Sequence, residues 1–253
     1  MVDERFTELL MPTLDAFSEM LRTVKPMVKM EDVDDILVAD FSSIKNNDAR
    51  QVIERLYSMS IRANKAIHEV HSVYNDMQLC QLMSRRFPWR KGTFKRSDHL
   101  HFSWMLFVNL CYLFRLKLKQ AYNVAQPLAA LSKGANKFDV ASELKLLDHK
   151  IGRHIRARGE HWHQWNVGHK WIKDYRMFEF LDQAGELPRG LPPIDGIFRV
   201  AQSELVSDVQ DAMEAMDTSL ETLLKATAND ISHGMNLVSN FLKNYAADQQ
   251  AAE

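Results

Sequence analysis

Histidine, arginine and glutamate side chains are concentrated between residues 149 and 169 of this 253-residue chain, a stretch that reads HKIGRHIRARGEHWHQWNVGH. Four of its histidines lie between residues 154 and 169. Arginine is a permanent cation that binds phosphate through two parallel hydrogen bonds, and histidine exchanges protons near neutral pH. This combination suits phosphate binding joined to acid–base chemistry.

An amphipathic helix over residues 139–158 is the element expected to position these side chains, with Asp139 as its N-cap. Its apolar residues recur at steps of three and four, which is typical of a helix with one buried face. If the helix continues past residue 159, Arg156 and His163 lie about 20° apart in projection, whereas Arg156 and His161 lie about 140° apart. His163 would then be the better partner for Arg156. The apolar positions are Val140, Leu144, Leu147, Ile151 and Ile155.

The segment LKLLDHKIGRHIRARGEHWH, residues 144–163, resembles the motif region of HEPN-type proteins. These are helical bundles marked by an arginine that is followed, after four to six residues, by a histidine. Arg156 fits this spacing with His161 or His163, and Arg158 fits it with His163. In that family the pair acts without a metal at a dimer interface. The arginine holds the scissile phosphate of RNA, and the histidine serves in acid–base transfer as the ribose 2′-hydroxyl attacks.

The resemblance implies a homodimer that cleaves RNA, or an RNA-binding protein derived from such a ribonuclease, and it implies no cofactor. Arg156 would be the phosphate clamp, and His161 or His163 the acid–base group. Directly after Arg156 the chain has Ala157, where the family usually has a polar residue. The position at the end of a cation-rich amphipathic helix favours Arg156 over other pairs with the same spacing. Those pairs are Arg62 with His68 and Arg96 with His101.

The formal charge of −1 is unevenly distributed along the chain. Nine Lys and Arg stand against one Asp between residues 83 and 120, whereas residues 182–253 hold twelve acids and four bases. Such a basic middle binds phosphate, or it is neutralised by the acidic ends within the fold. If the protein binds nucleic acid, the expected contacts come from the basic loop 85–97, from the Arg153 and Arg156 face of the 139–158 helix, and from Arg158 of the same helix. These residues are Arg85, Arg86, Arg90, Lys91, Arg153, Arg156 and Arg158.

Two other functions fit the sequence. One is a metal-binding helical bundle, since carboxylate and imidazole donors gather near residue 160. We expect no metal there, because Arg153 and Arg156 would repel a cation. The other is a non-catalytic interaction or immunity-type protein whose acidic C-terminal helix, with Met213, Met216 and Leu220, binds a protein partner. The candidate metal donors are Glu160, His161 and His163, with His154 and His169 nearby.

The rest of the chain carries helical patterns. With only nine Gly and seven Pro, long regular elements are favoured. The sequence predicts an all-α fold, an antiparallel helical bundle of long helices with a C-terminal helical arm and no strand pair. Residues 98–114, apolar nearly all round, should form the most buried helix. Helices are expected over 3–24, 31–45, 48–84, 98–126, 139–158 and 197–246, the last of which would break, if anywhere, near Gly234.

The Pro- and Gly-rich stretch 185–196 is the clearest boundary in the sequence. We therefore expect a bundle core over 1–184 and a C-terminal helical segment over 197–253 that packs on the bundle or on a second subunit. Cys80 and Cys111 lie in apolar helical patterns and should be core residues, not a disulfide. Without a leader pattern or an uncharged run of eighteen apolar residues, a cytoplasmic protein that does not span a membrane is expected.

Overall fold

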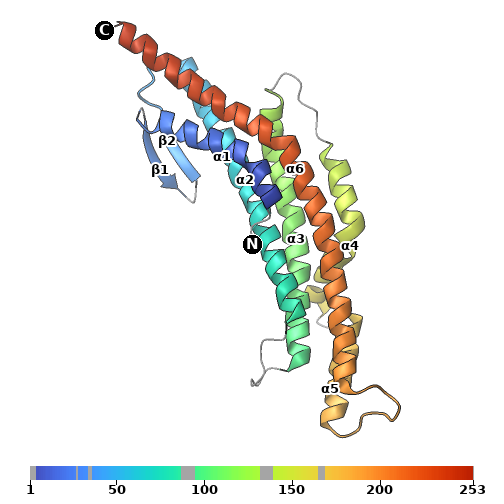
Figure 1. The fold of residues 1–253 in the computed structure, drawn as a ribbon. Coiled ribbons are helices and arrows are strands. Elements are labelled where there is room, and N and C mark those ends of the chain that lie inside the picture. The colour runs from blue at the N-terminus through green and yellow to red at the C-terminus, as the bar shows by residue number, and fades with distance from the viewer. Residues whose placement is uncertain are drawn as a thin grey trace. The chain divides into compact units, whose positions relative to one another are not determined.

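The computed structural model describes residues 4–26, 28–33, 36–86, 95–131, 139–164 and 169–252. Within these ranges the chain forms six helices and one two-stranded sheet, which confirms the predicted all-α helical bundle (Figure 1). No helix in the described ranges has the length and apolar character needed to cross a membrane. The helices are α1 (Glu4–Val24), α2 (Asn47–Arg85), α3 (Arg96–Ala129), α4 (Val140–Gln164), α5 (Lys170–Gln183) and α6 (Ile194–Ala252).

The prediction of a helix over residues 31–45, and with it the expectation of no strand pair, was wrong. The chain forms an antiparallel hairpin there. Strand β1 (Lys29–Val33) pairs with β2 (Ile36–Asp40) so that Val33 lies opposite Ile36. Leu37 and Ala39 are half-buried, while Val38 and Asp40 are exposed. This period of two suits a strand, and β-branched residues such as Val33 and Ile36 favour strands over helices. The acids at the start of the segment were mistaken for a helix N-terminus.

The chain forms two compact units. Unit 1 comprises residues 1–71, 117–141 and 220–253, and unit 2 comprises residues 72–116 and 142–219. Helices α2, α3 and α6 contribute residues to both units. Residues 184–193 connect α5 to α6, and the last three residues of the predicted boundary 185–196 form the start of α6. The division of the chain into domains at that boundary stays a prediction.

Unit 2 is an antiparallel arrangement of α2, α3, α4 and α6, which three pairs of contacts define. From α2 to α3, the Cys80 Sγ lies 3.7 Å from the Ser103 carbonyl oxygen, and the Met83 carbonyl oxygen lies 3.2 Å from the His99 imidazole. From α3 to α4, Arg115 meets Asp148 and Asn109 meets Arg158. From α2 to α6, Tyr74 meets Asp217 and Ser84 meets Gln202. In each pair the residue numbers rise on one helix as they fall on the other.

The predicted core helix α3 is buried along one face. Trp104 and Phe107 are 2% and 0% exposed, as expected for residues at the centre of unit 2. Phe102 is nevertheless 55% exposed, so the helix is not covered all round. Cys80 and Cys111 are buried free cysteines, as predicted. Burial raises the pKa of the Cys80 thiol to about 12, which keeps it protonated and unreactive at neutral pH.

Helix α6 runs unbroken through Gly234, the position at which the sequence predicts a break if the helix has one. A Cβ atom at this position would lie 2.9 Å from the Leu128 Cδ2 and 2.9 Å from the Ser60 Oγ. Both neighbours are buried within unit 1. The glycine therefore permits close packing of α6 against α2 and α3 and does not end the helix.

Two glycine substitutions should change stability in opposite directions. Gly234→Ala gains helix propensity but forces a methyl group against two buried side chains, so we expect unfolding to become easier by about 1 kcal/mol. Gly159→Ala meets nothing within 4 Å and should stabilise the protein by about 0.5–1 kcal/mol. Urea unfolding of both variants checks this pair, and equal shifts of the same sign would contradict the packing role of Gly234.

Candidate nucleic-acid interface

Helix α4 carries the predicted site and continues past the position where its sequence changes character. Leu144, Leu147 and Ile151 are buried along one face, which anchors the helix in the bundle. The backbone remains helical through Gly159 to Gln164. The helix thus continues past residue 159, which is the condition under which position 163 is a better partner for residue 156 than position 161. The side chains of residues 160–164, His161 and His163 among them, lie outside the described residues.

Arg156 is exposed on α4 and forms no ion pair with any residue that the structure describes. Its Nη1 lies 3.6 Å from the place that a Cβ atom at Gly152 would occupy. The guanidinium thus lies along its own helix, one turn back, and no carboxylate in the described part of the chain pairs with it. An exposed arginine of this kind keeps its hydrogen-bond donors available for an anion from outside.

Arg153, three residues earlier, is engaged within the protein. Its Nη2 donates to the Asp208 Oδ1 of α6 at 2.7 Å, and its Nε donates to the His154 Nε2 at 3.1 Å. The side chain is 59% exposed, so water screens this ion pair. Two of its donors are already used, one by Asp208 of α6 and one by the neighbouring His154 of α4, which distinguishes Arg153 from Arg156 as a candidate phosphate ligand.

His154 is buried between α4 and α3. Its ring lies 4.7 Å from the Phe107 ring, edge to face, and the residue is only 6% exposed. Burial lowers the pKa of its imidazole to about 4, because the charged form would lose hydration. A neutral ring can accept the hydrogen bond from Arg153, so the pKa and the hydrogen-bond geometry agree. His154 is consequently a core residue and not a solvent-facing acid or base.

Asp208 of α6 joins α4 to the start of α5. Besides Arg153, it faces the His169 Nε2, which lies 3.1 Å from its Oδ2. Burial opposes ionisation of Asp208, but the hydrogen bond from His169 and the charge of Arg153 outweigh it and lower the pKa. The carboxylate is thus ionised, and the imidazole nitrogen must be the donor. His169 Nδ1 is buried and has no hydrogen-bond partner among the residues that the structure describes.

Arg158 is also held by its neighbours. Its Nε donates to the Asn109 Oδ1 of α3 at 2.8 Å, and its guanidinium lies 4.0 Å from the centre of the Tyr112 ring. Such a cation–π contact stabilises the stacked arrangement. Of the three arginines predicted to bind phosphate from this helix, Arg153 and Arg158 therefore bridge helices, and Arg156 forms no such contact with the described residues.

The basic middle of the chain is partly neutralised within each unit. Arg96 pairs with Asp195 and Arg115 with Asp148 in unit 2, and Lys117 pairs with Glu69 in unit 1. Each of these ion pairs removes a cation from the set that a phosphate would meet. Of the loop residues predicted to bind RNA, Arg85 and Arg86 are exposed, and Arg90 and Lys91 lie outside the described residues.

Arg85 and Arg86 lie at the same end of unit 2 as the C-terminal end of α4. The His99 contact with the Met83 carbonyl places the end of α2 beside the start of α3. Helix α4 runs antiparallel to α3, and Arg158 already reaches Asn109, so later α4 residues lie nearer the start of α3. Arg85 and Arg86 thus share one end of the unit with the motif helix.

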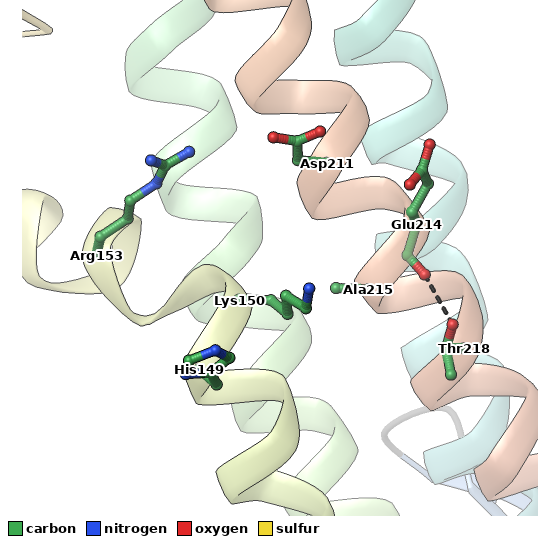
Figure 2. A pocket seen from close by; sticks show the side chains of 7 residues that line it. All are labelled: His149, Lys150, Arg153, Asp211, Glu214, Ala215 and Thr218. Atoms are coloured by element: carbon green, nitrogen blue, oxygen red, sulfur yellow. Dashed lines mark hydrogen bonds between the residues drawn. The ribbon is translucent and has the colours of Figure 1, made fainter.

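A hollow of about 540 Å³ lies between α4 and α6 within unit 2. Figure 2 shows His149, Lys150 and Arg153 on one wall and Asp211 and Glu214 on the other. A phosphate inside the hollow would therefore meet carboxylates as well as cations, which is unfavourable. Arg156 is not among the lining residues, so the candidate phosphate ligand lies outside the hollow.

Comparison with known proteins adds no relative: no protein-family model, curated protein or solved structure matches this chain.

Among the side chains that the structure describes, no group of three or more His, Cys, Asp or Glu could hold a metal ion. The predicted donors Glu160, His161 and His163 lie outside that set.

Three residues of this region escaped the sequence analysis: Asp208, Asn109 and Tyr112. Asp208 could have been noticed, because it follows Leu205 and precedes Val209, both of which are fully buried. An acid inside an apolar stripe usually has a partner. Asn109 and Tyr112 carry no comparable signal, since polar or aromatic residues within a mostly apolar helix have many ordinary roles.

Proposed function

We propose that this protein is a HEPN-like RNA-binding protein that cleaves RNA without a metal, and that it works as a homodimer. Arg156 binds the scissile phosphate, and a histidine in the last turn of α4, His163 ahead of His161, transfers protons. Arg85 and Arg86 extend the phosphate-binding surface. Arg153 and Arg158 hold α4 in place.

The observation that carries this proposal is the continuous helix from Val140 to Gln164, with Arg156 exposed on it and paired to no carboxylate among the side chains that the structure describes. Residue 163 follows Arg156 by about two helical turns and so falls on the same side of α4. An arginine and a histidine placed in this way can approach one phosphate from one helix. The neutralising ion pairs of the basic middle do not involve Arg156.

The proposed reaction uses the RNA's own 2′-hydroxyl as nucleophile. The 2′-oxygen forms a bond to phosphorus, the bond to the 5′-oxygen breaks, and the products are a 2′,3′-cyclic phosphate and a 5′-hydroxyl. Histidine accepts the 2′-hydroxyl proton or supplies a proton to the leaving oxygen, and water or the partner subunit supplies the complementary group. The guanidinium of Arg156 stabilises the negative charge that builds on the phosphoryl oxygens.

Cleavage of a structured RNA in the presence of EDTA tests the proposal. Wild type should cleave, and Arg156→Ala should be slower by about 100-fold, since it loses a charge-assisted contact to the transition state. Arg62→Ala is the matched control, because Arg62 is exposed on α2 and is followed, after five residues, by His68, which is also within the four-to-six-residue range. Absence of cleavage by wild type, or equal loss in both variants, would reject the proposal.

A further inference from the structure

Asp208 has hydrogen-bond partners on both sides of the proposed motif. Arg153 lies immediately before the motif segment 154–164 on α4, and His169 lies five residues after the end of α4, at the N-cap position of α5. Both donate to the same carboxylate, Arg153 at 2.7 Å and His169 at 3.1 Å. One side chain on α6 thus fixes two points of the chain that enclose the motif.

We infer that Asp208 is the positioning residue of the α4 site: it holds the last turns of α4 in register so that Arg156 and the histidine two turns later can meet one phosphate. This inference rests on the proposed function for its RNA readout, but the contacts themselves do not. Asp208 does not act on the substrate. Its two carboxylate oxygens are both used within the protein, and its side chain is only 20% exposed.

The hydrogen-bond pattern around Asp208 favours anchoring over proton transfer. The His169 Nε2 donates to the carboxylate, and its Nδ1 is buried without a hydrogen-bond partner among the described residues. An imidazole nitrogen without access to solvent cannot exchange a proton with RNA. His169 therefore ties α5 to α6.

The contacts of Arg153 also support an anchoring role for Asp208. Its Nε donates to His154, which is buried against Phe107 of α3. The chain of contacts from α6 through Arg153 to His154 thus reaches the core beneath the motif. A change at Asp208 releases one end of this chain at Arg153 and the other at His169, while the apolar stripe of α4 remains in contact with the bundle.

Hydrogen–deuterium exchange of wild type, Asp208→Asn and Asp211→Asn tests the inference. Asp211 is the control, since it is an exposed carboxylate on the same helix, three residues later, that lines the hollow. We expect Asp208→Asn to speed exchange of amides 154–164 and of the start of α5 by about tenfold, because it weakens two charge-assisted hydrogen bonds. Exchange at the start of α4 and in α3 should stay as in wild type, and Asp211→Asn should change neither.

The RNA assay separates this inference from the proposed function. In a cleaving protein, Asp208→Asn should lower kcat by about tenfold with KM unchanged, and Asp208→Glu should restore part of the rate. If wild type does not cleave RNA, the proposed function fails while the exchange result still decides the anchoring role. Unchanged exchange at 154–164, or a uniform rise throughout unit 2, would overturn the inference. Should Asp208→Asn fail to fold, Arg153→Gln and His169→Gln remove its two partners one at a time.

Discussion

His163→Ala is expected to slow RNA cleavage by about 100-fold or more, while His161→Ala keeps most of the wild-type rate. The reason is the continuous helix α4, which places residue 163 within about 20° of Arg156 in projection and residue 161 about 140° away. A general acid or base contributes about 10²–10⁴-fold to such a reaction. Single-turnover cleavage with saturating protein measures the chemical step directly.

Thermal stability is the control for this pair, because both histidines belong to the same last turn of α4. Melting temperatures of the two variants should agree with wild type within a few degrees. A large loss in His161→Ala with little change in His163→Ala would contradict the prediction that residue 163, which lies on the same side of α4 as Arg156, is the catalytic partner. Equal and complete loss in both variants would mean that the two histidines act together.

The free energy of unfolding should fall by about 3 kcal/mol between pH 7 and pH 4 through His154 alone. Its pKa is about 4 in the folded protein against an ordinary value of 6.5, because the ring is buried against Phe107. Between pH 6.5 and pH 4 the His154 imidazole is therefore protonated in the unfolded chain but neutral in the folded protein, so acid favours unfolding. The contribution is complete above pH 6.5, falls as the pH drops to 4, and levels off below that.

A difference measurement isolates this effect, since burial also lowers the pKa of His68 and His99. His154→Gln keeps an acceptor for Arg153 but cannot take up a proton. Urea unfolding of both proteins from pH 7 to pH 4 should show a flatter profile in the variant by about 3 kcal/mol. Asp208 does not affect the comparison. Its pKa is lowered in the folded protein, so the stability that its carboxylate contributes is lost only as the pH falls below about 4. Parallel profiles would contradict a buried neutral His154.

The sequence predicted much of the fold because apolar spacing alone identifies long helices. The α4 stripe of Leu144, Leu147 and Ile151 is buried as expected. The hairpin was missed because five-residue strands leave little room for a period of two to show. The packing role of Gly234 was missed because it depends on Leu128 and Ser60, which are distant in sequence.

The arginines of the site illustrate what periodicity cannot decide. Sequence reasoning grouped Arg153, Arg156 and Arg158 as phosphate ligands because they share a cationic helix. Their contacts separate them, since Arg153 is paired to Asp208 and Arg158 to Asn109, while Arg156 has no such partner among the described residues. Those partners come from α6 and α3, and only the tertiary fold brings them to α4.

The salt dependence of RNA binding tests the central claim, that Arg156 of α4 contacts RNA phosphate, most directly. Affinity for a single-stranded RNA should fall as salt rises from about 50 to 200 mM, because each phosphate contact releases counterions. Arg156→Ala should weaken binding and reduce the slope of log K against log salt by about 0.7, the value of one lost contact to a single strand. Arg62→Ala should leave affinity and slope as in wild type. An Arg156→Ala slope equal to that of wild type would contradict the claim, as would wild-type protein that does not bind RNA.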